Sequence, residues 1–330
     1  MLVSYIIPFY NGTLSIKHCL DSICSIGIDE SQYEIIIIDD CSPMEAQFVV
    51  ADYLKKRSNI RVIRHEKNKR QGGAKNTGLN AAIGKYVAFA DQDDMIQPKN
   101  VFAALEFAHQ NDVDMLACHF DILNEDGQIC EKGIDVGDGL IMDGKGFCER
   151  FFQTGCNLAP WANLYKRKFL LDAAHPFEEN VVMEDADWIA WHWIHAGKVG
   201  IFNRSIYTWI MNPASITHSQ HYVNRADWIK YGYRKMRDAQ SYYSLSTSFA
   251  DKMMEDGKNN ISGGMKRLWK VDNYFKFYQH LGTILQELQK MKWTGIVKVF
   301  INYPRLSQLF LFTIGSSFKL LSFAKNKLLK

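Results

Sequence analysis

The sequence has little of what marks several large classes of protein. Its seven cysteines are scattered and form no C-x-x-C pair, which argues against a zinc or thiol-redox centre and favours buried thiols in a reducing compartment. The net charge is only +3, from 39 basic and 36 acidic residues, so nucleic acid is not expected as a partner. Internal repeats and low-complexity tracts are absent, and a disordered or fibrous chain is excluded.

Long hydrophobic runs are missing as well. The first eight residues contain no basic region and no cleavage site, so no signal peptide is expected and the protein is predicted to be cytoplasmic. The longest uncharged stretch near the C-terminus, residues 306–318, is shorter than the roughly 20 residues that a spanning helix needs. This stretch is therefore predicted to lie on a membrane at most, without crossing it.

What the sequence does contain is a globular composition with an alternating pattern. Its 330 residues, of which 47% are hydrophobic, suffice for about two domains of roughly 150 residues each. Short apolar, β-branched runs alternate with helical patterns, which indicates parallel strands joined by crossover helices. The expected strands span residues 2–7, 34–38, 60–64, 86–90 and 114–119.

Helical patterns fill the gaps between these runs. Thr13 is predicted to cap a helix, and Pro98 to open another. Further helices are expected from about residue 45 to 57 and from 72 toward 84. The result is a doubly wound, mostly parallel α/β sheet, in which ligands bind beyond the carboxyl ends of the strands. The apolar positions of the first helix are Ile16, Cys19, Leu20 and Ile23.

The rest of the chain changes character near residue 222. Residues 120–180 are less regular, with turns at 126–127 and 138–139, and are interpreted as short strands that wall one side of the ligand site. From residue 224 the strand pattern stops and helical segments follow. We therefore expect an α/β domain over residues 1–222 and a helical C-terminal region over 223–330.

Three carboxylates follow the fourth expected strand directly. Asp91, Asp93 and Asp94 repel one another unless a cation neutralises them, and Mg²⁺ and Mn²⁺ prefer carboxylate oxygens together with substrate phosphates. The cluster therefore predicts a divalent metal site. The alternative is a solvated acidic turn that caps the helix at Pro98.

Two other segments offer groups to a nucleotide. Asp39 and Asp40 end the second strand, where a carboxylate accepts hydrogen bonds from a base or a ribose; alternatively they cap the helix after Pro43. Residues 72–76 (GGAKN) open a helix and present small residues, backbone N–H groups and the Lys75 cation to a diphosphate. They match neither G-x-G-x-x-G nor the P-loop pattern, so dinucleotide and P-loop proteins lack support.

Glu184 and Asp185 begin a further helix pattern, whose apolar face contains Ile189 and Trp193. Helix N-termini stabilise ionised carboxylates, so Asp185 is a candidate general base at neutral pH. The alternative is that both residues are ordinary charges at the start of a helix.

In their order along the chain, these segments resemble glycosyltransferase family 2, a group of nucleotide-sugar-dependent enzymes with the GT-A fold. The resemblance covers residues 1 to about 220. The region after 223 resembles the family only in being helical, since the C-terminal regions of its members are helical and variable. The segments that carry it are residues 4–11 (SYIIPFYN), 34–42 (EIIIIDDCS), 72–79 (GGAKNTGL), 84–94 (GKYVAFADQDD), 184–185 and 207–217.

The resemblance assigns roles in donor binding. Pro8, Tyr10 and Asp39 are expected to bind the nucleotide. Asp91 and Asp93 correspond to the D-x-D element that meets the diphosphate and a metal ion, Mn²⁺ or Mg²⁺. Further candidates around the donor are Asp40, Lys75, Asn76, Gln92, Asp94, Glu184 and His218.

It also assigns the chemistry. Asp185 is expected to be the catalytic base. Lys75 stands where many relatives have arginine, so it keeps the cation but loses the bidentate geometry. His218 follows residues 215–217 and is a candidate for the diphosphate or metal, with a surface histidine as the alternative.

The implied reaction moves a sugar from a nucleotide diphosphate donor, expected to be a UDP-sugar, to an acceptor hydroxyl with inversion. The acceptor is expected to be a glycan or a lipid-linked intermediate of cell-surface polysaccharide synthesis. One alternative is a Mg²⁺-dependent phosphatase with an aspartate nucleophile, which also places D-x-D after a parallel strand. The other is a nucleotide-sugar-binding assembly protein without catalysis.

The charge of the tail suggests a second partner. Residues 1–287 carry a net charge of −5, and the eight charged residues after Glu287 are all basic. Basic and apolar residues interleave over 290–330, which favours attachment to an anionic membrane surface. The alternative is a tail packed on the body or on a second copy of the chain. The apolar residues concerned are Trp293, Ile296, Val297, Phe300, Ile301, Leu309, Phe310 and Phe312.

Overall fold

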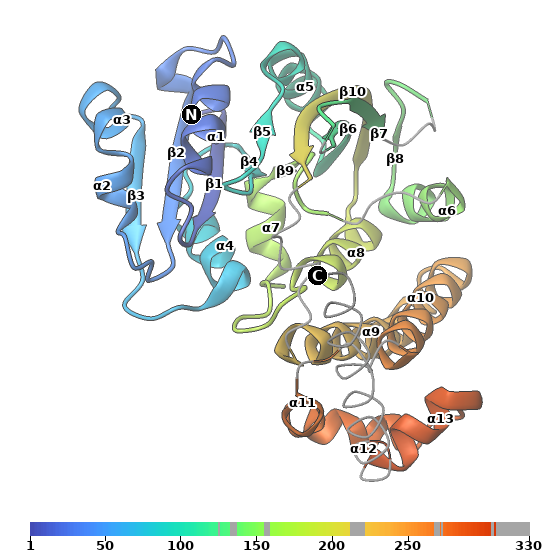
Figure 1. The fold of residues 1–330 in the computed structure, drawn as a ribbon. Coiled ribbons are helices and arrows are strands. Elements are labelled where there is room, and N and C mark those ends of the chain that lie inside the picture. Colours follow the sequence, from blue (N-terminus) through green and yellow to red (C-terminus); the bar gives the residue numbers. More distant parts are fainter. Residues whose placement is uncertain are drawn as a thin grey trace. The chain divides into compact units, whose positions relative to one another are not determined.

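The computed structural model describes residues 1–124, 126–132, 137–154, 159–211, 222–266, 271, 273–304 and 307 (Figure 1). The chain divides into two compact units, Met1–Asn212 and Pro213–Lys330. The first contains a mixed sheet with helices around it, and the second is helical in its described part. That the first unit is the catalytic domain stays a prediction. Residues 215–218, which include His218, lie outside the described residues.

One half of the sheet is parallel and doubly wound as expected. Its strands lie in the order β3 (Ile60–Arg64), β2 (Tyr33–Asp39), β1 (Val3–Phe9) and β4 (Tyr86–Phe89). Every residue of β1, β2 and β4 is buried, because helices cover both faces of these strands. The apolar runs in the sequence therefore predicted these strands to within two residues at each end.

The crossover helices hold this half together. α1 (Ser15–Cys24) buries the four apolar positions expected of it, but it begins after Leu14 without a side-chain cap, so the predicted cap at Thr13 is wrong. α4 (Arg70–Ala81) packs against β1 and β2. The single helix expected over 45–57 is two short helices, α2 (Ala46–Val49) and α3 (Ala51–Lys56), because the chain turns at the fully buried Val50.

The other half of the sheet is mixed. β9 (Asn163–Lys166) lies antiparallel between β4 and β6 (Met115–Leu123), and β10 (Val199–Ile210) runs parallel to β6. The short strand β5 (Met95–Ile96) closes the edge against β10, and α5 (Pro98–Asn111) packs against β6 and β10. Three further elements belong to this half: β7 (Ile129–Lys132), β8 (Ile141–Met142) and α6 (Gly144–Thr154).

Two helices complete the first unit. α7 (Arg167–Ala173) follows β9, and α8 (Asp185–His195) precedes β10. The irregular residues 120–180 contain α7 and the short strands β7, β8 and β9, and the short strands are in line with the expectation for this segment.

The second unit has its own apolar core, formed by α9 (Tyr222–Tyr242), α10 (Thr247–Lys266), α11 (Tyr274–Leu281), α12 (Thr283–Gln289) and α13 (Gly295–Asn302). Val297, Phe300 and Ile301 are buried in that core, so these three residues are not available to a membrane surface. Ile296 and Val299 are exposed. Leu309, Phe310 and Phe312 lie outside the described residues.

Candidate active site

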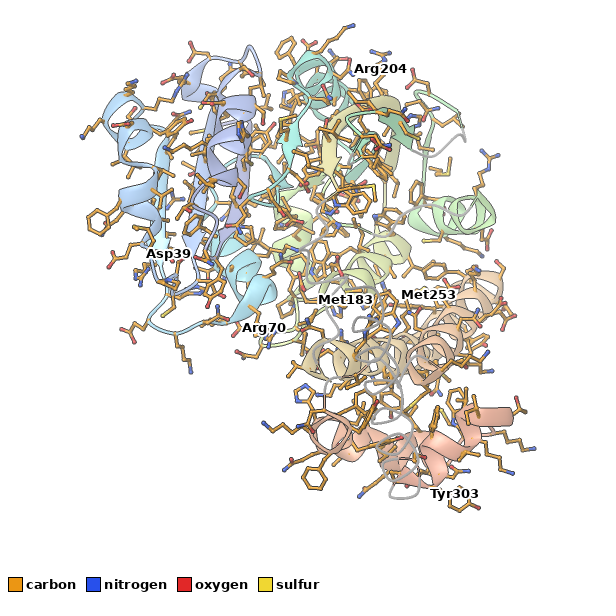
Figure 2. All side chains as sticks on the ribbon, viewed as in Figure 1. Asp39, Arg70, Met183, Arg204, Met253 and Tyr303 are labelled. Carbon is orange, nitrogen blue, oxygen red and sulfur yellow. The ribbon has the colours of Figure 1, made fainter. Side chains whose placement is uncertain are left out.

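The candidate residues lie at or near the carboxyl ends of β1, β2 and β4, in α4, and at the start of α8. In Figure 2, Asp39 lies at the end of β2, and Arg70 and Met183 are labelled toward the same end of the sheet. Four residues with positive φ mark these segments: Asn11 (54°), Cys41 (61°), Arg70 (61°) and Met183 (64°). Residues other than glycine rarely adopt such conformations. They do so where surrounding contacts impose a particular loop shape.

The loops after β1 and β4 are joined by a reciprocal pair of hydrogen bonds. The Tyr10 N–H donates to Gln92 Oε1 (3.1 Å), and Gln92 Nε2 donates to the Tyr10 carbonyl (3.0 Å). A Cβ at Gly12 would lie 2.2 Å from Gln92 Oε1, so only glycine allows this approach. The amide of Gln92 therefore supports the loop, whereas Tyr10 as a whole is 52% exposed and open to a ligand.

Asp39 is fully buried and both of its carboxylate oxygens have partners. Oδ1 accepts from the Ser42 N–H (2.8 Å), and Oδ2 accepts from the Ala46 N–H (2.9 Å) and forms an ion pair with Arg64. Because Ala46 is the first residue of α2, this carboxylate holds the start of a helix, as the alternative interpretation proposed. Pro8 lies inside β1, one residue before its end.

Asp40 connects three elements from a buried position. Its Oδ1 accepts from the Lys69 N–H (2.8 Å) and lies 2.8 Å from His65 Nδ1. The other ring nitrogen of His65 is 2.9 Å from Thr77 Oγ1 on α4. Sequence reasoning did not single out His65, because nothing in the sequence indicates that the end of β3 meets Asp40.

The acidic loop after β4 separates its three carboxylates. Asp94 turns inward: Tyr207 donates its hydroxyl to Oδ2 (2.7 Å) and the Ile210 N–H donates to Oδ1 (2.9 Å). Burial and the neighbouring Asp91 raise the pKa of Asp94 to about 8. Tyr207 also accepts a hydrogen bond from the Asp91 N–H (3.0 Å), so β10 fixes the shape of this loop.

Asp91 and Asp93 are half-buried and remain available. In the part of the chain that the structure describes, neither carboxylate accepts a hydrogen bond or forms an ion pair. Burial raises the pKa of Asp91 to about 6, with Asp93 and Glu184 adding to the shift and Lys75 opposing it. No group of three or more His, Cys, Asp or Glu that could hold a metal occurs among the described residues. Two carboxylates nevertheless suit Mg²⁺ or Mn²⁺, which commonly take one or two protein carboxylates and complete their coordination with phosphates and water.

α4 holds the segment that leads into α8. Asn76 exchanges two hydrogen bonds with the backbone of Phe177, donating to its carbonyl (2.8 Å) and accepting from its N–H (2.9 Å). A Cβ at Gly72 would lie 2.2 Å from the Glu178 carbonyl oxygen, so glycine is required where this segment crosses α4. Lys75 is buried, with Nζ 2.8 Å from Glu184 Oε1 and 5.3 Å from the centre of the Phe177 ring. The ammonium expected at a phosphate is thus engaged in an internal ion pair.

Asp185 is the first residue of α8, directly after the buried Glu184. Burial and the charge of Glu184 raise the pKa of Asp185 to about 7, while Lys75 opposes the shift and Asp91 adds to it. Because Asp91 is one of the charges that raise the pKa of Asp185, the loop after β4 and the start of α8 lie within electrostatic reach of each other. A loop with two carboxylates that are unpaired among the described residues and a carboxylate whose pKa is raised to about 7 therefore share one region.

Comparison with known proteins adds independent findings. The model of the family described as "Glycosyl transferase family 2" matches residues 4–169, half of the chain. Over 249 residues the chain is 27% identical to the uncharacterized glycosyltransferase EpsJ of Bacillus subtilis (strain 168), and the match covers 74% of this chain and 71% of the relative.

Two other similar proteins extend the comparison. The poly(ribitol-phosphate) beta-glucosyltransferase of Bacillus spizizenii is 34% identical over 116 residues, which are 35% of this chain and 18% of that relative. A crystal structure of residues 1–349 of S. aureus TarS in complex with UDP-GlcNAc superposes with a TM-score of 0.67. The match covers 97% of this chain and 92% of that TarS fragment at 18% identity, and it shows that the two chains share a fold.

Proposed function

Because the chain belongs to glycosyl transferase family 2 and has the GT-A fold, we propose that it transfers a sugar from a UDP-sugar, with inversion, to a hydroxyl group of a cell-surface polysaccharide or its lipid-linked precursor. That it is a glycosyltransferase follows from the family. The donor, the acceptor and the stereochemistry are the proposal. The observation that carries the proposed chemistry is that Asp91 and Asp185 both lie within electrostatic reach of the buried Lys75. The donor and acceptor classes rest on the similar proteins.

The base in the proposed reaction is Asp185. A carboxylate takes a proton most effectively when its pKa lies near the working pH, and burial with Glu184 raises the pKa of Asp185 to about 7. Asp185 accepts the proton of the acceptor hydroxyl while that oxygen bonds to the anomeric carbon. The bond from this carbon to the diphosphate oxygen breaks in the same step, on the opposite face, so the configuration inverts and the nucleoside diphosphate leaves with the bonding electrons.

The donor side relies on Asp91, Asp93 and Tyr10. Asp91 and Asp93 would hold Mn²⁺ or Mg²⁺, which when bound stabilises the negative charge that develops on the leaving diphosphate. Gln92 holds the backbone of Tyr10, and the exposed Tyr10 ring is suited to stack on the base. Asp39 supports this side through the loop it caps, and Asp94 through its contacts with β10.

The similar proteins support the substrate classes. TarS was crystallised with UDP-GlcNAc, which supports a uridine diphosphate donor here. The relative named for poly(ribitol-phosphate) supports a cell-wall type of polymer as acceptor. The family also favours transfer over a phosphatase, which would leave the matched segments unexplained. The intact carboxylates at Asp91, Asp93 and Asp185 disfavour an assembly protein without catalysis.

A screen of nucleotide sugars tests the proposal. UDP-, GDP- and dTDP-sugars are added to the purified chain with and without Mn²⁺, and the melting temperature and the release of nucleoside diphosphate are recorded. A ligand that binds the native state raises the melting temperature, so UDP-sugars with Mn²⁺ are expected to give the largest increase and slow donor hydrolysis. Stabilisation by GDP- or dTDP-sugars alone would overturn the uridine assignment, and release of inorganic phosphate from the donor would favour the phosphatase.

A further inference from the structure

Lys75 occupies an unusual position for a lysine. It lies on α4 with a side chain that is 2% exposed, and burying an ammonium is unfavourable unless opposite charge surrounds it. Glu184 supplies that charge at 2.8 Å, and the face of the Phe177 ring lies 5.3 Å from Nζ. Burial alone would lower the pKa of Lys75, but Glu184, Asp91 and Asp185 outweigh it and hold the pKa above its ordinary value, so the ammonium stays charged.

The partner of Lys75 is the residue directly before the proposed base. Glu184 precedes Asp185 at the start of α8, and the segment leading to it is tied to α4 by the two Asn76–Phe177 hydrogen bonds. The Lys75–Glu184 ion pair and the Asn76–Phe177 hydrogen bonds therefore together fix the start of α8 against α4. An ammonium enclosed in this way faces Glu184 instead of an open phosphate site.

We propose that Lys75 is a positioning residue that acts through Glu184: its buried ammonium fixes the start of α8 and offsets the charge of Glu184, so that Asp185 stays ionised beside the loop after β4. This inference rests on the proposed function, because it takes Asp185 as the base. It replaces the expected contact between Lys75 and the donor diphosphate.

The proposal predicts opposite effects on Asp185 from the two partners. Among the side chains that the structure describes, the groups that interact with Asp185 are Glu184 directly before it, Lys75 on α4, Asp91 in the loop after β4 and Tyr165 on β9. Removing the Lys75 cation raises the pKa of Asp185, because Glu184 is then uncompensated. Removing the Glu184 charge lowers the pKa of Asp185. Removing both charges leaves it close to the wild-type value.

Four variants test this: Lys75→Met, Glu184→Gln, the double variant, and Lys75→Arg as the control that keeps the charge. The pH dependence of kcat is measured with saturating Mn²⁺, and Kd for UDP is measured by calorimetry. Activity requires the ionised base, so kcat falls below the pKa of Asp185. We expect Lys75→Met to move this acid limb upward by about one pH unit, which is roughly a tenfold loss of kcat at pH 6. Glu184→Gln should move the acid limb to lower pH. In Lys75→Arg and in the double variant, the acid limb should stay near its wild-type position.

The readouts separate this role from the alternatives. Kd for UDP and KM for the donor should stay within about twofold in Lys75→Met, because the lysine does not touch the donor. A large rise in both, with an unmoved acid limb, would assign Lys75 to the diphosphate instead. Equal loss of kcat in both single variants without any movement of the limb would reduce the pair to a structural contact.

Two precautions keep the test decisive. Circular dichroism establishes whether each variant folds, and if Lys75→Met does not, Glu184→Gln and the double variant carry the test: an unmoved limb in Glu184→Gln then overturns the proposal. A wild-type chain that neither binds nor turns over any nucleotide sugar would sink the proposed function itself. An active wild type with an unmoved limb in the variants would sink only the role of Lys75.

Discussion

Two acidic regions of this molecule look alike in sequence and differ in structure. After β2, Asp39 and Asp40 are buried and bonded to backbone N–H groups, Arg64 and His65. After β4, Asp91 and Asp93 stand half-buried without such partners among the described residues. A carboxylate whose oxygens are all engaged supports a loop, whereas one without hydrogen-bond partners in the protein remains available to a ligand.

Asp94 and Asp185 show the same distinction on a finer scale. Both are carboxylates with a raised pKa, to about 8 and about 7, but Asp94 accepts two hydrogen bonds from β10 and Asp185 starts a helix beside Lys75 and Asp91. The comparison teaches that the value of a pKa does not by itself identify the base. The hydrogen-bond partners of the carboxylate distinguish a supporting role from a catalytic one.

The largest expected effect is at Asp185, at the start of α8. Asp185→Asn removes the proton acceptor but keeps the size of the side chain, so kcat should fall by roughly 100- to 10,000-fold. Calorimetry should still detect binding of the UDP-sugar with Mn²⁺. Turnover close to wild type in this variant would remove Asp185 from the mechanism.

Asp93→Asn tests the metal side of the same region. Because its carboxylate has no hydrogen bond to lose among the described residues, the melting temperature should change little, while activity should fall by roughly 100-fold and need more Mn²⁺. A titration of initial rate against Mn²⁺ measures the change. An unaltered Mn²⁺ requirement would contradict the role as ligand.

Asp39→Asn should show the reverse pattern, and this contrast sharpens the comparison. The substitution removes the charge that pairs with Arg64 and one of the acceptors at the start of α2, which should destabilise the first unit by about 2 kcal/mol. For a unit of this size that corresponds to a melting temperature lower by roughly 4–8 °C. The Mn²⁺ requirement should be unchanged. A stable variant with a large loss of UDP affinity would instead place Asp39 in the nucleotide site.

The smallest effect concerns the basic tail. No helix in the described part of the chain is long and apolar enough to cross a membrane, and three of the apolar residues in the tail are buried. If the tail binds an anionic surface, the exposed Ile296 and Val299 contribute, and Ile296→Glu with Val299→Glu should weaken sedimentation with phosphatidylserine vesicles severalfold. Equal sedimentation of the double variant and the wild type, or none of either, would remove these positions from any membrane role.

The parallel half of the sheet could be predicted because its signal is local. Strands covered on both faces consist of continuous apolar residues, and the buried face of α1 follows helical spacing. In the mixed half, the sequence predicted β6 and the start of α5 at Pro98, but not the pairing of the strands. Nothing in the four residues of β9 indicates that they insert between β4 and β6, since that pairing depends on the rest of the fold.

The sequence alone determined the α/β fold and its family, because apolar runs and short motifs are properties of neighbouring residues. It also named the carboxylates around which the site is built. Only the tertiary structure decided which of them are engaged, since the partners are remote: Tyr207 on β10 turns Asp94 inward, and Lys75 on α4 is paired with Glu184 beside Asp185. Burial and charge at a side chain depend on segments that approach it in space, and no local pattern records that approach.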